Sequence, residues 1–503
     1  MTLETVPPAQ PLDHLALRGA DDAPALLLRT GPLTYEALKG RVARLAGWLS
    51  AAVREPGGRV ACWLPKSELA CLLPLAAARA GLVYVPINPL LKRAQVAHIL
   101  ADSGAGLLIA NASRLATLEP GDCANAETIK EDEANALAAS ATVLGPSDHN
   151  PGALAQILYT SGSTGRPKGV MLSHANLWLG AVSVAAYLKL QPDDRLLGVM
   201  PLSFDYGQNQ LLAGWYAGAS IAPLDYLTPR DVIKAVERER LTTLAGMPPL
   251  WVQLLDQDWG DTDASLRRLT NTGGALTVDL VRKLRAMFPR ADLYAMYGLT
   301  EAFRSTYLDP ALIDAHPTSI GKAIPFAEVM VVGDDGDEAA PGEEGELVHA
   351  GPLVAQGYWR DPDRTAERFR PAPAWSRYGG VAVWSGDRVR RDEQGLLHFV
   401  GRRDAMIKTS GNRVSPQEIE EAALATGLVA EAVALGVPDA RLGQAIHLVA
   451  RAAGEVDEAR LRRALAQTLP NFMVPQAFHW KQAMPVSANG KIDRATLAQE
   501  LAR

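Results

Sequence analysis

The chain has 503 residues, which at roughly 150 residues per domain is enough for about three domains. Apolar residues make up 48% of the chain and charged residues 21%, a balance that excludes a disordered chain, a collagen and a coiled coil. Fifty basic residues face 56 acidic ones for a net charge of −6, and no basic block occurs, so we expect neither nucleic acid nor an anionic membrane surface as a partner.

The N-terminal region lacks the features of a targeting signal, because an early acid and two prolines stand where basic residues and an apolar run are needed. The longest apolar stretch, 69–78, has about ten residues where a membrane span needs about twenty. The three cysteines Cys62, Cys71 and Cys123 form no CxxC pair, which argues against a disulfide framework and a cysteine-rich zinc site. We expect a cytoplasmic protein without membrane insertion.

From residue 59 onward, short apolar strands alternate with segments of helical period. This alternation predicts helices packed on largely parallel sheets, in two similar α/β lobes. The predicted strands are 60–64, 83–87, 105–110, 195–200 and 242–246, and the predicted helices are 68–80, 93–103 and 229–239.

The segment from about 329 to 400 is rich in Gly, Asp and short β-type runs, and it predicts a smaller β region. Beyond Arg403 follow a hairpin-like segment, a helix from Pro416 and an α+β pattern. The fold class is therefore α/β, with an N-terminal domain over 1–402 and a small, mobile α+β C-terminal domain over 403–503.

The sharpest local feature is the glycine- and hydroxyl-rich segment 159–169, which follows an apolar run and precedes a helix-like stretch after Ser173. Small residues let backbone N–H groups turn towards an anion and Lys168 adds a positive charge, so a triphosphate is a suitable ligand. The segment is not a Walker A loop, because Lys168 follows proline and precedes glycine. Taken alone, it would equally fit a flexible surface turn.

Further segments follow in order along the chain: Tyr297-Gly-Leu-Thr-Glu301, Trp384-Ser-Gly-Asp387, Gly401-Arg-Arg-Asp404 and Pro485-Val-Ser-Ala-Asn-Gly-Lys491-Ile-Asp-Arg494. With these segments, the sequence resembles the adenylate-forming superfamily of AMP-forming acyl-CoA synthetases, peptide-synthetase adenylation domains and luciferases, over roughly 33–494. Among these groups it looks closest to the acyl-CoA ligases.

The resemblance implies an ATP site. Tyr297 would pack against adenine, Thr300 would hydrogen-bond the α-phosphate, and Glu301 would bind Mg²⁺. Asp387 would accept from both ribose hydroxyls, with Arg402 beside the same sugar. The remaining residues expected to hold ATP or AMP are Thr160, Ser161, Gly162, Ser163, Thr164, Gly165, Lys168, Gly273 and Gly274.

The resemblance also implies a reaction with two halves. A carboxylate attacks the α-phosphorus of ATP to give an acyl-adenylate and pyrophosphate, and a thiol then displaces AMP. Lys491 would supply positive charge in the first half, together with Thr300 and Glu301. The C-terminal domain would then rotate about a hinge at Asp404, and Gly411 would let the pantetheine arm pass close to the backbone.

The substrate is left open by the sequence. The Phe204-Asp205 pair looks like peptide-synthetase adenylation domains, whose Asp pairs with the substrate's α-ammonium, whereas the hairpin 408–413 looks more like CoA ligases. Asp205 would contact an ammonium group, cap a helix starting near Gly207, or make another substrate contact. The other expected pocket residues are Tyr206, Met247 and Phe303.

The acyl acceptor is expected to be CoA, because only nine residues follow Arg494 and they leave no room for a fused carrier domain. The alternative is an amino-acid or aryl-acid adenylating enzyme that loads the phosphopantetheine of a separate carrier protein. A luciferase-like oxidation is a weaker hypothesis, since that activity is rare in the superfamily that the sequence resembles. A catalytically inactive binding protein is also weaker, since Lys491, Glu301 and Asp387 are all present.

Overall fold

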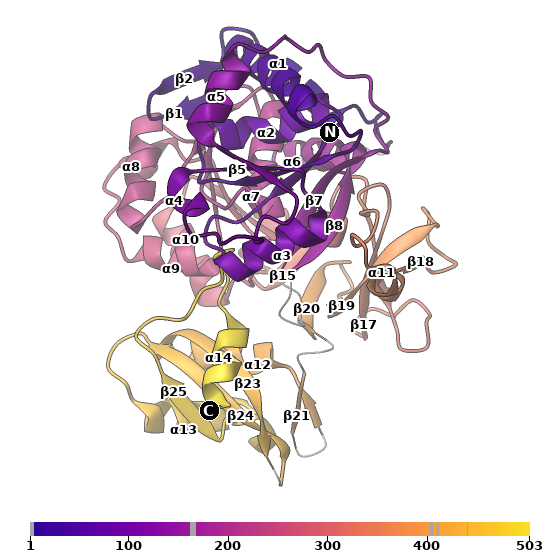
Figure 1. Ribbon diagram of the computed structural model, residues 1–503. Coiled ribbons are helices and arrows are strands. Elements are labelled where there is room, and N and C mark those ends of the chain that lie inside the picture. Colours follow the sequence, from indigo (N-terminus) through magenta and orange to yellow (C-terminus); the bar gives the residue numbers. More distant parts are fainter. Residues whose placement is uncertain (1–4, 161–166, 403–405, 410–411, 440, 503) are drawn as a thin grey trace.

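The computed structural model describes residues 5–160, 167–402, 406–409, 412–439 and 441–502. It has the α/β fold class expected from the sequence, with a large N-terminal domain and a small C-terminal domain that lies beneath it in Figure 1. The two domains have separate hydrophobic cores, because the buried residues after 406 form clusters of their own. Ser161–Gly165, Asp404 and Gly411 lie outside the described residues, so the hinge and the exact domain boundary stay predictions.

A six-stranded sheet in the order β6-β5-β3-β4-β7-β8 forms the first lobe. Its strands run parallel except β8, which pairs antiparallel with β7 and so places Thr160 and Lys168, from the expected phosphate-binding segment, side by side. The strands are β3 (Arg59–Trp63), β4 (Val83–Pro86), β5 (Leu107–Ala110), β6 (Glu127–Lys130), β7 (Leu154–Thr160) and β8 (Lys168–Ser173).

A second, longer sheet runs from a parallel half into an antiparallel half, in the order β16-β17-β19-β20-β15-β14-β13-β12-β11-β9-β10-β1-β2, with β18 on β19. The parallel half consists of β1 (Pro24–Leu28), β9 (Arg195–Gly198), β10 (Ser220–Pro223), β11 (Thr243–Gly246), β12 (Arg268–Asn271) and β13 (Asp292–Tyr297). The antiparallel strands are β2 (Gly31–Thr34), β14 (Thr306–Tyr307), β15 (Ser319–Ala323), β16 (Glu328–Val332), β17 (Glu344–Ala350), β18 (Phe369–Pro371), β19 (Val381–Arg391) and β20 (Leu397–Arg402).

Helices of the N-terminal domain pack on these two sheets, and several begin at side-chain caps that the sequence makes visible. Ser173 caps α6 by accepting from the backbone N–H of Asn176, and Pro229 stands in the first turn of α8 after Thr228. The helices are α1 (Tyr35–Ala52), α2 (Glu68–Arg79), α3 (Arg93–Ser103), α4 (Ala112–Leu115), α5 (Glu131–Ala139), α6 (His174–Tyr187), α7 (Asp205–Tyr216), α8 (Pro229–Glu239), α9 (Pro248–Leu255), α10 (Val278–Met287) and α11 (Pro362–Arg368).

The C-terminal domain is an α+β unit with a sheet in the order β22-β21-β24-β23 and β25 alongside β24. Its strands are β21 (Ile407–Thr409), β22 (Asn412–Val414), β23 (Val429–Asp439), β24 (Gly443–Ala452) and β25 (Ala477–Trp480), and its helices are α12 (Pro416–Ala425), α13 (Glu458–Thr468) and α14 (Arg494–Leu501). The hairpin expected after Arg403 is the antiparallel pair β21–β22.

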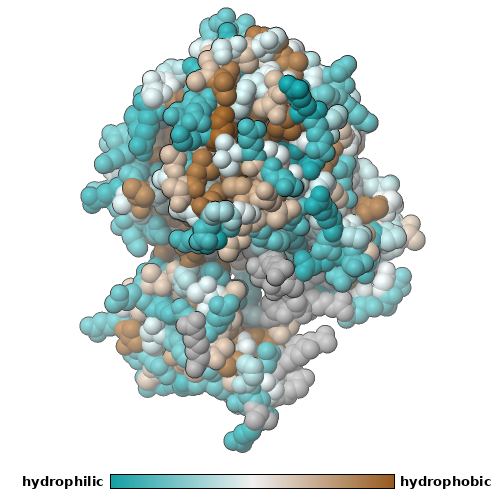
Figure 2. Space-filling model, viewed as in Figure 1, coloured by the Kyte–Doolittle hydropathy of each residue, from teal (hydrophilic) through white to brown (hydrophobic). Residues whose placement is uncertain are grey.

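Figure 2 shows a largely hydrophilic face interrupted by small hydrophobic areas. None of the helices formed by the described residues combines the length and the apolar character that a membrane span requires.

Candidate active site

A cavity of about 1800 Å³ lies between the two domains and collects most of the expected site residues. The parallel strands β11, β12 and β13 end at its wall, and the residues after them (Met247, Gly273, Gly274 and Tyr297 at the end of β13) face it. Ligands bind at the carboxyl ends of parallel strands because neighbouring loops diverge there. Lys491 reaches the same cavity from the C-terminal domain.

The β7–β8 hairpin lines the end of the cavity where the expected phosphate-binding residues lie. Thr160 closes β7 and Lys168 opens β8, and both line the cavity. The Lys168 Nζ lies 2.9 Å from Glu301 Oε1 and 2.7 Å from the hydroxyl of Tyr358. The expected triphosphate and Mg²⁺ residues therefore meet at one point.

Tyr358 was missed by the sequence reasoning. Its hydroxyl donates to Glu301 Oε1 at 2.6 Å, and its ring lies beneath the Lys168 ammonium at 4.2 Å. Burial raises the pKa of Glu301, but the charge of Lys168 and the hydrogen bond from Tyr358 outweigh burial and lower it overall. Glu301 thus stays a carboxylate. A tyrosine after Gly357 carries no local signal of this role.

The expected ribose residues are brought together by the register of two antiparallel strands. Asp387 on β19 lies opposite Arg402 on β20, with Arg402 Nε 3.5 Å from Asp387 Oδ1. The hydroxyl of Tyr297 donates to Asp387 Oδ2 at 2.5 Å. One carboxylate therefore joins the end of β13 to the antiparallel half of the sheet, where an acceptor for two ribose hydroxyls would be needed.

Lys491 enters the cavity over a glycine. Its Nζ lies 5.1 Å from the centre of the Phe204 ring. Gly273 has φ +79°, and a Cβ at this position would lie 2.9 Å from the Cε of Lys491 and 3.0 Å from the Sδ of Met247. Burial lowers the pKa of Lys491, while the negative charge of Asp205 opposes this effect. Position 273 thus favours glycine both for its backbone and for the passage of the lysine.

Asp205 does not cap a helix, so that hypothesis is wrong. Helix α7 begins at Asp205 itself, with Phe204 in the capping position and no side-chain cap. The Asp205 carboxylate instead accepts from Arg304 Nη1 at 2.8 Å and from Thr300 Oγ1 at 3.3 Å. The side chains of Asp205 and Arg304 are only 5% and 3% exposed, so they form a buried ion pair at the cavity wall.

Two expected pocket residues do not line the cavity. The Tyr206 hydroxyl donates to the backbone oxygen of Thr270 at 2.7 Å, which directs the side chain towards the sheet. Phe303 is 2% exposed and packs against Gly180 of α6, which has no side chain to obstruct the ring. Of the expected pocket residues, the structure brings Asp205 and Met247 to the cavity.

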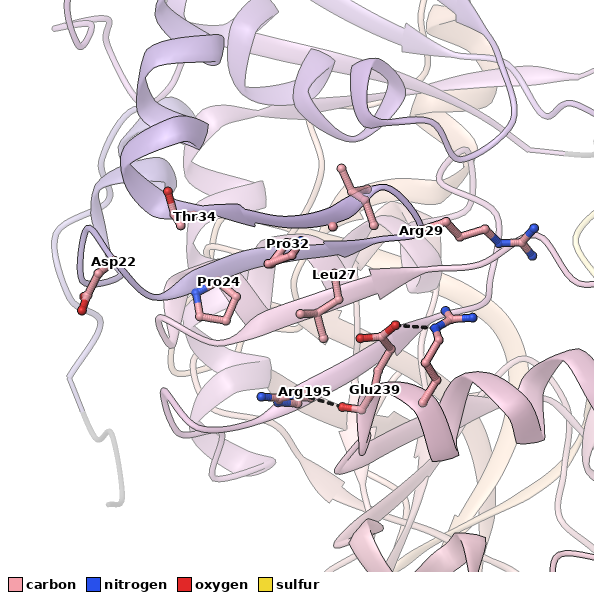
Figure 3. Close-up of a pocket in the computed structure, with 11 residues that line it drawn as sticks. Asp22, Pro24, Leu27, Arg29, Pro32, Thr34, Arg195 and Glu239 are labelled. Carbon is pink, nitrogen blue, oxygen red and sulfur yellow. Dashed lines mark hydrogen bonds and ion pairs between the residues drawn. The ribbon is translucent and has the colours of Figure 1, made fainter.

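A second hollow of about 720 Å³ lies at the edge of the long sheet, between the β1–β2 hairpin and the end of α8 (Figure 3). Three of its charged residues contact one another, because Arg195 Nη1 donates to the Glu239 backbone oxygen at 2.9 Å and Arg238 Nε lies 2.6 Å from Glu239 Oε1. It contains none of the expected site residues, so the inter-domain cavity is the candidate active site.

Comparisons with known proteins agree with this site. Residues 12–359 match the family AMP-binding enzyme, and residues 418–491 match AMP-binding enzyme C-terminal domain. Feruloyl-CoA synthase of Amycolatopsis sp. is 33% identical over 92% of this chain and 92% of its own length. L-proline--[L-prolyl-carrier protein] ligase of Pseudomonas fluorescens is 32% identical over 93% of this chain and 94% of its own length. The chain also matches tyrocidine synthase 2 of Brevibacillus parabrevis at 32% identity over 94% of this chain, but it spans only 13% of that protein.

Among solved structures, ATP-bound MatB from Rhodopseudomonas palustris superimposes with a TM-score of 0.89 at 28% identity, covering 98% of this chain and 99% of MatB. The two family matches together extend over most of the chain, in the order that the motifs predicted. The chain belongs to the AMP-binding enzymes, the family of AMP-forming, adenylate-forming ligases.

Proposed function

We propose that this AMP-forming ligase activates a carboxylic acid that lacks an α-amino group and transfers the acyl group to the thiol of CoA. The observation that carries the substrate class is the buried ion pair between Asp205 and Arg304. A substrate ammonium needs an aspartate that is free to receive it, but Arg304 already neutralises Asp205 at 2.8 Å. A simple acid leaves this pair intact.

The first half-reaction joins two anions, and the cavity supplies the positive charge that this requires. The substrate carboxylate oxygen attacks the α-phosphorus of ATP, the bond to the bridging oxygen breaks, and pyrophosphate leaves. Lys491 would stabilise the charge that develops at the reacting oxygens. Burial lowers the pKa of Lys491. Two incoming anions oppose that shift, so substrate binding favours the charged lysine.

The residues of the cavity fit ATP and Mg²⁺. Lys168 and Thr160 would hold phosphate oxygens, Tyr297 and Asp387 would hold the nucleoside, and Glu301 would hold the metal. A single carboxylate suits Mg²⁺, which takes one or two protein carboxylates together with phosphate oxygens. The bound metal would neutralise charge on the phosphates. Tyr358 keeps the Glu301 carboxylate oriented for this role.

The second half-reaction would have CoA as the acceptor. Its thiol would attack the acyl carbon of the adenylate and release AMP, which yields one thioester, one AMP and one pyrophosphate per ATP. Feruloyl-CoA synthase matches this chain over 92% of both lengths, and its name identifies CoA as the thiol. Gly411 on the thiol path and Asp404 at the hinge stay part of this proposal.

A second candidate is an enzyme that adenylates an amino acid and loads a separate carrier protein. The Phe204-Asp205 pair favours it, and so does the 32% identity to L-proline--[L-prolyl-carrier protein] ligase. In that case an ammonium would have to displace the Arg304 guanidinium from Asp205.

A pyrophosphate-exchange screen distinguishes these candidates. Purified enzyme is incubated with ATP, Mg²⁺ and labelled pyrophosphate, with each of the twenty amino acids in one arm and aliphatic, aryl and dicarboxylic acids in the other. We expect exchange with one group of simple acids and, after addition of CoA, equal amounts of AMP and acyl-CoA. Exchange confined to amino acids would establish the second candidate, and formation of ADP would exclude both.

A further inference from the structure

Asn88, far from the expected motifs, joins the two domains next to the catalytic lysine. It lies just after β4 and is 5% exposed. Its side-chain Nδ2 donates to the Ala488 backbone oxygen at 2.8 Å and to Asn489 Oδ1 at 2.9 Å. Its Oδ1 accepts from the backbone N–H of Leu90 at 2.9 Å, so both ends of the amide are engaged.

The residues that Asn88 holds belong to the turn that carries Lys491. The Ser487 N–H donates to the Lys491 backbone oxygen at 2.6 Å, and the Gly490 N–H donates to the Ser487 oxygen at 2.8 Å. The turn is thus closed by its own backbone and moves as a unit. Fixing Ala488 and Asn489 therefore fixes where the Lys491 side chain enters the cavity.

Asn88 binds the C-terminal domain at residues that are far in the sequence from the expected hinge at Asp404. Another hydrogen bond between the domains, from Ser415 Oγ to the Val400 oxygen, joins residues that lie on either side of the expected hinge at Asp404 and close to it in the sequence. The bonds from Asn88 reach across the cavity mouth to a segment 400 residues later in the chain. They exist only while Lys491 is in place, and any rotation of the C-terminal domain breaks them.

We propose that Asn88 is a positioning residue that latches the C-terminal domain in the arrangement for adenylation and releases it for the thiol step. The proposal rests on the proposed function, because it assigns the latch to the first half-reaction. Two partly buried hydrogen bonds favour the arrangement for adenylation without preventing its release, since the net contribution of such a bond is modest.

A purely local role for Asn88 makes a different prediction. Its Oδ1 bond to Leu90 forms a side-chain turn, which aspartate also forms. Asn88→Asp therefore keeps the local turn and removes both donor bonds to the other domain. The Asn489 amide can reverse and donate to the new carboxylate, but the Ala488 carbonyl oxygen cannot. The substitution thus separates the latch from the turn.

The two half-reactions are measured separately for wild type, Asn88→Asp and the control Asn111→Asp. Asn111 only accepts hydrogen bonds at the start of α4, a role that aspartate retains. We expect Asn88→Asp to lower kcat of pyrophosphate exchange about tenfold or more, with KM unchanged. Thioester formation from supplied acyl-adenylate should be at least as fast as in wild type. Equal effects on both half-reactions, or none on either, would overturn the proposal.

A distance measurement tests the latch without turnover. Spin labels are placed at Leu227→Cys and Val456→Cys, which are 95% and 57% exposed and lie on different domains, with Cys123→Ser to remove the accessible native thiol. We expect Asn88→Asp to broaden or shift the distance distribution and Asn111→Asp to leave it unchanged. An unchanged distribution in Asn88→Asp overturns the latch. If wild type showed no exchange with any acid, the proposed function would fail, and this distance measurement would still decide the latch.

Discussion

Replacing Arg304 by methionine should expose the energetic role of the buried ion pair. Methionine keeps a long, unbranched side chain but removes the charge 2.8 Å from Asp205. Asp205 is 5% exposed and would keep the hydrogen bond from Thr300 at 3.3 Å. Removing one partner of a buried ion pair costs about 3–5 kcal/mol, so Arg304→Met should lower the free energy of unfolding of the N-terminal domain by about that amount.

A double-mutant cycle, in which the free energy of unfolding of each variant is measured by urea denaturation, separates the interaction energy of the ion pair from the loss of packing. Asp205→Asn/Arg304→Met removes both charges, so we expect its cost to be smaller than the sum of the single costs by about 1 kcal/mol or more. The control Lys130→Met breaks an exposed pair with Glu133, whose side chains are 48% and 51% exposed, and should change little. Additivity of the two single substitutions would refute the ion pair.

The single substitution Arg304→Met should also change which substrates the enzyme adenylates. Freed from Arg304, the Asp205 carboxylate would be available to an ammonium group at the cavity wall. The rate of pyrophosphate exchange with an amino acid, relative to the matching acid without the amino group, should rise about tenfold, which corresponds to about 1.4 kcal/mol. A ratio equal to that of wild type would show that Arg304 does not keep Asp205 from amino-acid substrates.

The remaining predictions concern the lysine, the metal site and the start of α7. Because burial lowers the pKa of Lys491 below its ordinary 10.5 in the free enzyme, kcat/KM for adenylation should decline on the alkaline side at a pH below 10.5, and the same profile for Lys491→Arg would contradict this assignment. Tyr358→Phe removes a hydrogen bond to Glu301 and should raise the Mg²⁺ concentration for half-maximal exchange about tenfold; unchanged magnesium dependence would contradict its orienting role. Gly207→Ala would place a Cβ 2.1 Å from the Pro201 oxygen and should lower the thermal midpoint by several degrees, and an unaltered midpoint would contradict this contact.

The α/β alternation was predictable because its signals are local. The predicted helices over 93–103 and 229–239 coincide with α3 and α8, where apolar spacing and terminal residues agree. The predicted strand over 60–64 is displaced by one residue from β3, as expected where a buried apolar run carries no clear end.

The long-range contacts on which the proposals rest were not predictable, because they join distant parts of the chain. Arg304 lies 99 residues from Asp205, and Asn88 lies 401 residues from Asn489. Tyr206 was expected in the pocket from its neighbour in sequence, but its hydroxyl pairs with Thr270 and directs it into the sheet. Sequence order identifies which residues lie near the site, whereas the packing of the sheet decides which of them face it.

Asp205 also connects the proposed acyl pocket with the proposed reacting groups. It accepts from Thr300, the residue expected at the α-phosphate. Burial lowers the pKa of Lys491, the charge of Asp205 opposes this effect, and the charge of Arg304 adds to it. An amino-acid substrate would add a further cation beside Arg304 and Lys491 and would compete for the carboxylate that balances them. A simple acid adds only the anion that these two cations stabilise, so the charges of the pocket favour the same substrate class as the buried ion pair.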